Sequence, residues 1–196
     1  MRYAAIVAAV AHLAAATPAD GPASRKDAAL LKQKVATITA HAESQSSLPR
    51  RTTVTENEVN AYLVYEAGNQ IPVGVVEPSL TILGTGRLSA RAVVDLDAVR
   101  KARTSSSLLD PLNFLTGRLP VTATGVLKTG NGMGKFELEN SSVAGIRVPK
   151  ILLQEIVSYY SRTADKPEGI GLDDPFELPA RIREIQVERG QAIIVQ

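Results

Sequence analysis

The stretch RLPVTATGVLKTGNGMGKFELENSSV, residues 118–143, contains two alternating segments joined by three closely spaced glycines, Gly130, Gly132 and Gly134. A period of two, apolar then polar, is typical of β-strands whose two faces differ. Glycine between two such segments supplies the positive φ that a tight turn requires. We therefore expect an antiparallel hairpin whose apolar face carries Leu119, Val121, Ala123, Leu127, Phe136 and Leu138.

The same glycines invite comparison with phosphate-binding loops, in which backbone N–H groups converge on an anion. Aligned on Gly134 and Lys135, the P-loop motif would need a glycine at Thr129 and a hydroxyl side chain at Phe136. Read as G-x-G-x-x-G from Gly130, the pattern would put its last glycine at Lys135. Because a strand and not a helix is expected next, no helix N-terminus would face the phosphate. The pattern favours a turn over nucleotide binding.

Helical periodicity predicts three helices. The first spans residues 25–45, with Leu31, Val35 and Ile38 on its apolar stripe, and the second spans residues 54–69. Thr55 and Glu58 form a T-x-x-E capping box at the start of the second helix. The strongest apolar stripe belongs to VPKILLQEIVSYYSR, residues 148–162.

Further strands are indicated on either side of the hairpin. GRLSARAVVDLDAV, residues 86–99, alternates most cleanly, PSLTILG before it predicts a partner, and the C-terminus predicts a second hairpin. Residues 98–117 read as an insert with two short helices and a Ser-rich loop. Helices and strands are segregated and do not alternate, so the fold class is α+β, with helices packed on an antiparallel sheet.

The chain divides into a targeting segment and one domain. Arg2 precedes an apolar stretch over residues 4–16, followed by small residues, which is typical of a signal peptide and too short for a membrane span. We expect a signal peptide over 1–19, an N-terminal helix and linker over 20–52, and a single domain over 53–196. The mature protein is expected to be periplasmic or secreted. An Ala-rich helix that stays attached, or an uncleaved anchor, is the alternative.

Composition excludes several classes of function. Lys and Arg number 22 against 20 Asp and Glu, so no broad basic footprint for nucleic acid exists. Trp is absent and aromatic residues are few, which leaves few stacking platforms for bases. With no cysteine and only two histidines, His12 and His41, disulfides, most zinc sites and a Ser–His–Asp relay lack their residues. We expect no metal and no cofactor.

Paired carboxylates are the remaining catalytic candidates. Asp95 with Asp97, and Asp173 with Asp174, are the kind of pairs that glycoside hydrolysis uses, but aromatic sugar platforms are scarce. We interpret them as exposed strand and turn charges and expect no enzyme. A hydrolase that uses Asp173 or Tyr160 is the enzymatic alternative.

Three motifs resemble bacterial tubular lipid-binding proteins, the SMP-like (TULIP-like) half-barrels of YceB-like lipoproteins and LmeA-like secreted proteins. They are VTENEVNAYL at residues 54–63, G-x-x-V-P at Gly145 to Pro149, and L-P-x-x-I-x-x-I-x-V-x-x-G from Leu178 to Gly190. The resemblance implies a curved antiparallel sheet, or half-barrel, packed against a long helix in the C-terminal half, with an apolar cleft for an acyl chain. YceB-like members carry a lipidated cysteine that this chain lacks, so a soluble shuttle fits better than a tethered one.

We therefore expect a secreted, non-enzymatic protein that binds a lipid or other apolar molecule and acts as its carrier. The expected ligand-binding residues are Val59, Leu63, Leu88, Ala90, Ala92, Val94, Val121, Ala123, Phe136, Leu138, Leu152 and Ile156. The expected gate, for transient membrane contact, is Leu108, Leu109, Phe114 and Leu115. Two alternatives stay open: ordinary close packing without a cleft, and an envelope structural or assembly factor whose sheet or terminal hairpin pairs with a protein partner.

Overall fold

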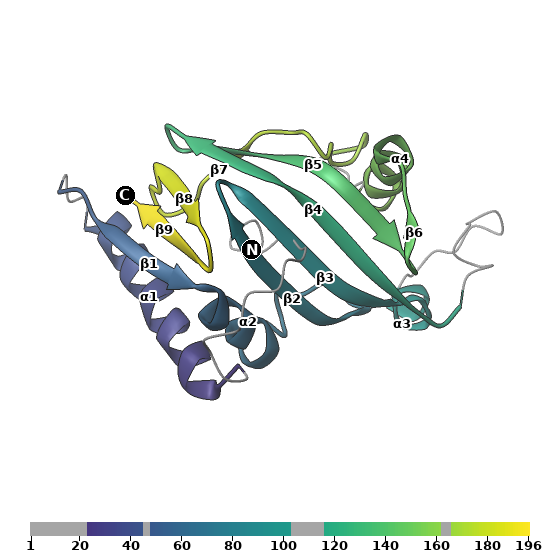
Figure 1. Cartoon of the computed structure of the whole chain (residues 1–196), viewed down its shortest axis with the longest axis horizontal. Coiled ribbons are helices and arrows are strands. Elements are labelled where there is room, and N and C mark those ends of the chain that lie inside the picture. The colour runs from purple at the N-terminus through teal and green to yellow at the C-terminus, as the bar shows by residue number, and fades with distance from the viewer. Residues whose placement is uncertain (1–22, 45–47, 103–115, 162–165) are drawn as a thin grey trace.

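The computed structural model describes residues 23–44, 48–102, 116–161 and 166–196 (Figure 1). In chain order the elements are α1 (Arg25–Glu43), β1 (Arg51–Thr55), α2 (Glu56–Tyr65), β2 (Val75–Gly84), β3 (Arg87–Asp95), α3 (Leu96–Ala102), β4 (Arg118–Gly130), β5 (Met133–Val143), β6 (Ile146–Arg147), α4 (Lys150–Tyr160), β7 (Phe176–Glu177), β8 (Glu184–Glu188) and β9 (Gln191–Val195).

The strands form two antiparallel sheets. The six-stranded sheet has the order β2-β3-β4-β5-β6, with β7 added beside β5, and the three-stranded sheet has the order β1-β9-β8. The large sheet is open, because β2 and β6 lie at opposite ends of its order. The predicted α+β class with an antiparallel sheet is thus confirmed, as are both predicted hairpins. Strand β1 was missed, since RTTVT is short and buries only Val54.

The glycine-rich stretch is a turn. Strands β4 and β5 pair up to Gly130 and Met133, and the two residues between them, Asn131 (φ 52°) and Gly132 (φ 81°), both have positive φ. Two positive φ values in a two-residue loop match a type I′ hairpin turn, for which Asn-Gly is the preferred pair. Gly134 has another purpose, because a Cβ there would lie 2.7 Å from the Phe176 ring of β7.

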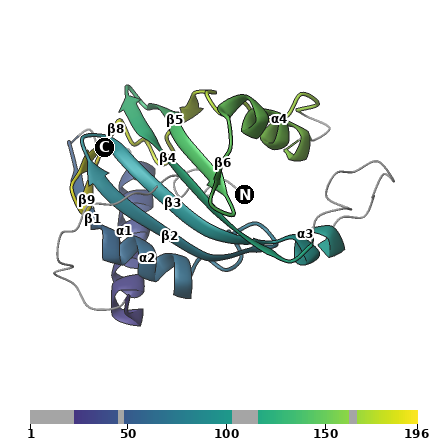
Figure 2. The same cartoon turned by 45° about the vertical axis from the view of Figure 1, so that its right-hand side comes forward.

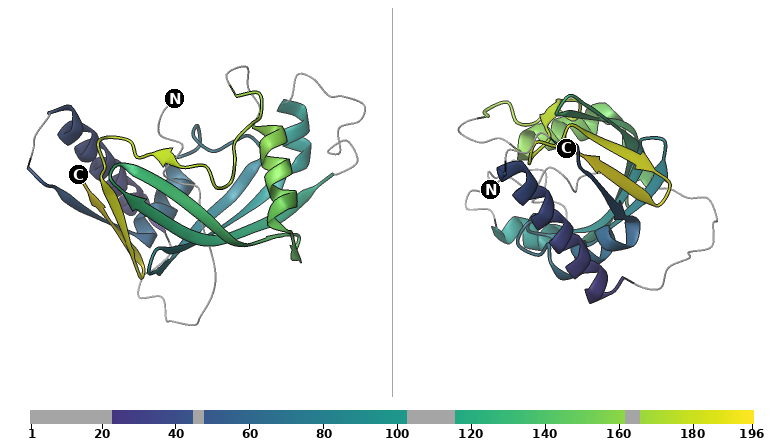
Figure 3. Two further views of the ribbon diagram at one scale, coloured as in Figure 1. Left: turned by 90° about the horizontal axis from the view of Figure 1, so that it is seen from above. Right: turned by 90° about the vertical axis from the view of Figure 1, so that its left-hand side faces the viewer.

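The helices are placed differently from the expectation. The helix predicted over 148–162 is α4, which has 11 residues, and the longest described helix is α1, with 19. α4 contacts β5 and lies near the end of the sheet away from α1 and α2 (Figures 2 and 3). The expected long C-terminal-half helix across the sheet is therefore not found among the described residues. Part of its apolar stripe is uncovered, since Leu152 is 52% exposed.

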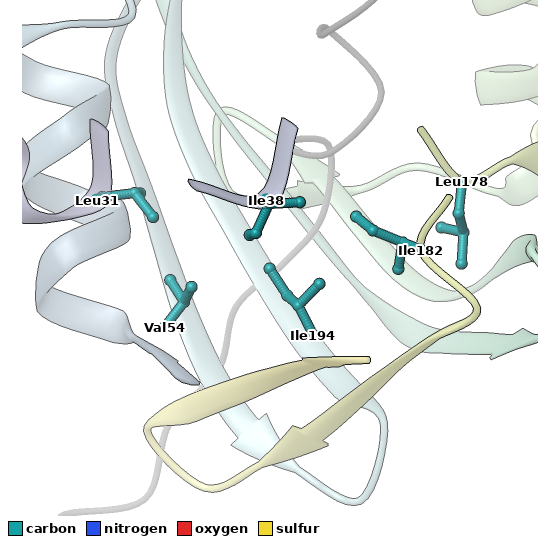
Figure 4. Packing of buried hydrophobic residues seen from close by; sticks show 6 residues of the cluster. All are labelled: Leu31, Ile38, Val54, Leu178, Ile182 and Ile194. Atoms are coloured by element: carbon teal, nitrogen blue, oxygen red, sulfur yellow. The ribbon is translucent and has the colours of Figure 1, made fainter. Parts of the chain in front are cut away.

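The main core lies at one end of the molecule, between α1 and the three-stranded sheet. α1 and α2 pack against each other, and β8 contacts both β2 and β4. Figure 4 shows the cluster that joins these layers, formed by Leu31, Ile38, Val54, Leu178, Ile182 and Ile194. A second cluster of Ile82, Leu88 and Val187 continues it onto the large sheet. The middle of the large sheet has no comparable buried cluster among the described residues.

Helix α2 begins with the predicted capping box and then covers the outer edge of β2. The Thr55 backbone N–H donates to Glu58 Oε2 at 2.9 Å, and the Glu58 N–H donates to Thr55 Oγ1 at 3.3 Å. One turn on, Asn60 Nδ2 donates to the Leu80 carbonyl oxygen at 2.7 Å, and Asn60 Oδ1 accepts from the Leu80 N–H at 2.7 Å. The amide therefore pairs with β2 as a neighbouring strand would, which satisfies an otherwise open sheet edge.

Replacing Asn60 with alanine should leave the Leu80 N–H and C=O without these partners. We expect the free energy of unfolding in urea to fall by about 2 kcal/mol, since an unsatisfied buried polar group costs about 1–3 kcal/mol. Asn57→Ala is the matched control, because Asn57 lies in the same helix and should change the stability by less than about 0.5 kcal/mol. Equal effects of the two substitutions would contradict the edge-closing role of Asn60.

Two glycines of the hairpin, Gly130 and Gly134, should differ in their response to alanine. Gly134→Ala should lower the free energy of unfolding by about 1–3 kcal/mol, because the new methyl group would overlap the Phe176 ring. Gly130→Ala should be nearly neutral, because a Cβ there meets no atom within 4 Å and its φ is not positive. Thermal and urea unfolding measure the stability of both variants. An unchanged free energy of unfolding in Gly134→Ala would show that Phe176 does not pack there.

Candidate apolar ligand site

An apolar cavity of about 260 Å³ lies at the end of the molecule that holds the core. Helices α1 and α2 form one wall, and strands of both sheets form the other. The residues that line it from the helices are Leu31, Val35, Ile38, Thr39, Val59, Tyr62 and Leu63. Those from the strands are Val54, Leu80, Ile82, Leu88, Leu127, Ile185, Val187, Ala192 and Ile194.

The lining suits hydrocarbon and does not suit water. Among the described residues that line the cavity, none is acidic, basic or histidine. A buried water needs about two to four polar partners, and an apolar cavity of about 150 Å³ in another protein stays dry and binds benzene. A volume of about 260 Å³ is therefore sufficient for a segment of an alkyl chain or a small ring.

The polar groups of the lining are few. Gln70 Nε2 donates to the Tyr62 hydroxyl oxygen at 2.9 Å, and the Gln70 residue is exposed. Val35, on the facing helix, is also exposed. The cavity thus has one margin where an amide and a phenol meet solvent, an arrangement that orients an amphiphilic ligand.

The structure brings some of the predicted site residues together and separates others. Val59, Leu63 and Leu88 line the cavity, and Phe136 packs against the neighbouring cluster. The residues further along the large sheet are half-buried and do not line it: Ala90, Ala92, Val94, Val121, Ala123 and Leu138. Leu152 and Ile156 lie in α4. The residues expected to form a gate, Leu108, Leu109, Phe114 and Leu115, and the segment 1–19 expected to be a signal peptide lie outside the described residues.

The register of β3 on β4 shows why some predicted residues line the cavity and others do not. Leu88 pairs with Gly125, Ala90 with Ala123, and Ala92 with Val121, so all six share one face of the sheet, as the alternation predicts. A Cβ at Gly125 would lie 2.5 Å from the Phe136 ring, so this ring lies across the strand at that point. The cavity is found where the helices cover this face, beside Leu88.

Sequence reasoning missed the walls that the second sheet supplies. Val54, Val187 and Ile194 come from short strands. Leu80 and Ile82 come from β2, which was predicted as a partner strand without any prediction of which of its residues face the core. The alternation of Leu80 and Ile82 with Ser79 and Thr81 could have identified that face. No local pattern indicates that β8 and β9 pack on α1.

The carboxylate pairs are engaged in structural contacts. Asp95 Oδ1 accepts from the Ala98 N–H at 2.9 Å, and this bond, together with the Arg118 guanidinium, lowers the pKa of Asp95 below its usual value. The hydrogen bond from Lys150 to Asp173 lowers the pKa of Asp173 in the same way. A general acid needs a raised pKa, so neither carboxylate suits that role.

Their neighbours are engaged as well. Asp97 Oδ2 accepts from the Gly117 N–H at 3.1 Å, and Asp174 Oδ2 accepts from the Gly171 N–H at 2.7 Å. Tyr160 lies in α4. Across the described ranges, no three His, Asp or Glu residues gather closely enough to hold a metal ion.

Two further results concern membrane-spanning helices and similarity to known proteins. Within the part of the chain that the structure describes, no helix is both long and apolar enough to cross a membrane. No protein-family model matches this sequence, and no curated protein matches it. The function must therefore be inferred from the residues of the cavity.

Proposed function

We propose that this chain is a periplasmic or secreted protein, without enzymatic activity, that binds the apolar part of a lipid or a similar molecule and carries it. The observation that supports this most directly is the cavity of about 260 Å³, whose described lining is free of charged residues and comes from both helices and both sheets. The signal peptide expected over residues 1–19 is the basis for the proposed location.

The size of the cavity argues for a ligand that extends beyond it. Pockets that enclose whole drug-sized ligands measure about 300–1,000 Å³, so this one lies just below that range. Each buried CH₂ group contributes about 0.8 kcal/mol. Several more methylene groups than the cavity holds are needed to offset the free energy lost on association. The half-buried face around Ala90 and Ala123 is the surface onto which the chain would continue.

In this proposal the large sheet acts as the wall of a half-barrel. Its apolar face has slim side chains at Ala90, Ala92 and Ala123, and a slim face lets an alkyl chain lie close to the backbone. α4 would supply the C-terminal-half helix of such a half-barrel, and the exposed apolar side chains of Ile151 and Leu152 support that role.

A second candidate function is an envelope assembly factor that acts through protein contacts. One observation favours it: Ile146 of β6 is 73% exposed and lies on the last strand in the order of the large sheet, five residues before the exposed Ile151. Edge strands with exposed apolar residues pair readily with other chains. A reproducible crosslinked partner, together with a protein that never contains lipid, would favour this function.

Organic extraction of the purified full-length protein, followed by mass spectrometry, should detect a bound lipid. Val59→Phe should weaken the binding of a fluorescent fatty acid by about tenfold or more, because the larger ring occupies part of the cavity. Val64→Phe is the matched control, since Val64 lies in the same helix, is 60% exposed and is outside the cavity.

Urea unfolding of both variants separates loss of binding from loss of folding. The proposal requires Val59→Phe to remain folded and to bind weakly while Val64→Phe binds as the unmodified protein does. Unchanged binding in a folded Val59→Phe variant, or a protein that repeatedly contains no lipid, would rule out the cavity as the ligand site.

A further inference from the structure

A second cavity, of about 460 Å³, adjoins the apolar one. The two share Ile182, which is 1% exposed and lines both. Figure 4 shows Ile182 between Ile194, which lines the apolar cavity, and Leu178, which lines the second one. The buried Ile182 side chain therefore belongs to the walls of both spaces.

The second cavity differs from the first in its chemistry. His41, Arg181 and Arg183 line it, and none of its described lining residues is Asp or Glu. The Arg183 guanidinium already donates to the main-chain oxygen of Gln196 at 2.9 Å. Arg181 is exposed, and no carboxylate of the described chain forms an ion pair with it. Arg181 is thus the cation best placed to meet an anion that enters.

The backbone holds Arg181 in a conformation that arginine disfavours. Ala180 (φ 52°) and Arg181 (φ 53°) both have positive φ, and the Ile182 N–H donates to the Pro179 carbonyl oxygen at 3.1 Å across the turn. These are the φ signs of a type I′ turn, for which Asn-Gly is preferred because Cβ atoms crowd the left-handed region.

In three other turns of the described chain with two successive positive φ values, the second residue is glycine: Gly86, Gly132 and Gly145. Glycine in place of Arg181 would relieve the crowding, so the arginine side chain is kept at a cost in stability. Residues held in disfavoured backbone conformations concentrate at functional sites, where the side chain is needed for another purpose.

We propose that Arg181 binds the anionic head of an amphiphile whose apolar part enters the neighbouring apolar cavity past Ile182. The guanidinium fork matches phosphate and carboxylate oxygens in a bidentate arrangement. His41 and Arg183 line the same wall and add hydrogen-bond donors. The inference rests on the proposed function and narrows its ligand class from any apolar molecule to an anionic amphiphile.

The position of Arg181 is fixed by a neighbouring side chain. Gln196 Nε2 donates to the Ile38 carbonyl oxygen at 2.9 Å and to the Ala180 carbonyl oxygen at 2.8 Å. The turn that presents Arg181 is thereby tied to α1, the helix that covers the apolar cavity. The head and the tail of the amphiphile would thus be bound by the turn and by α1, which Gln196 joins.

Titration calorimetry of the full chain with three probes tests the proposal: decyl phosphate, decyl maltoside with the same alkyl chain, and inorganic phosphate. The unmodified protein should bind decyl phosphate about tenfold or more tightly than decyl maltoside, since one charge-assisted contact changes affinity by about that factor. Arg181→Gly should abolish this preference while raising Tm by about 2–4 °C.

Ala144→Gly is the matched control, because Ala144 (φ 51°) is exposed and lines neither cavity, and glycine there relieves the same kind of backbone crowding while Arg181 stays in place. It should raise Tm similarly and keep the preference for decyl phosphate. A retained preference in Arg181→Gly, or a Tm lowered by that substitution, would overturn the proposal. Inorganic phosphate bound as tightly as decyl phosphate would also overturn it, because the site would then bind free anions without any contribution from the alkyl chain. Failure of both amphiphiles to bind would instead refute the proposed function itself, and this inference with it.

Discussion

The arrangement of the two sheets depends on the closure of the β2 edge by side chains of α2. Asn60 hydrogen-bonds both backbone groups of Leu80, and Glu56 Oε2 accepts from the Ile82 N–H at 2.6 Å. The same residues connect to the other sheet, since the Glu56 N–H donates to the Gly190 carbonyl oxygen and the Gly190 N–H donates to the Ile82 carbonyl oxygen, both at 2.8 Å. One helix terminus therefore fixes the turn of the β8–β9 hairpin against β2. The cavity walls come from both sheets, so these bonds also set the separation between them.

A buried ion pair holds α1 against α2, beside the contact between β2 and the β8–β9 turn. Glu58 is 6% exposed, and its carboxylate accepts from Lys34 Nζ at 2.6 and 2.7 Å as well as from the Thr55 N–H. Removing a carboxylate from water is costly unless it is paired, so α1 must stay where Lys34 can reach it. The helix itself buries Ala28, Leu31 and Ile38. Because polar contacts at its margins position α1, its apolar face need not fill the space beneath it, and a cavity remains.

Much of the fold could be predicted because its determinants are local. The period of two in β3, β4 and β5, the Asn-Gly turn and the Thr55–Glu58 capping box all act over a few residues. What lies opposite each apolar face could not be predicted, because periodicity shows which side chains share a face and not which element covers it. Leu152 carries a clear helical stripe and is half exposed, whereas Leu31, in a helix rich in lysine, is buried. For the site, the sequence identified Val59, Leu63 and Leu88, whereas the wall from the short strands β1, β8 and β9 depends on pairing between residues far apart in the chain.

The origin of the cavity also differs from the sequence-based expectation. Slim side chains such as Ala90 and Ala123 suggested that the space would lie above them, yet the cavity adjoins the larger Ile82 and Leu88. The space lies where α1 and α2 face strands of both sheets, and the side chains that line it there are not small. Gln196 ties α1 to the carbonyl group of Ala180, so any outward movement of α1 that widens the cavity also displaces the neighbouring turn. A ligand that fills the apolar space contacts α1, and a ligand that contacts the turn is bound to a segment that moves with α1. Their binding free energies are therefore coupled.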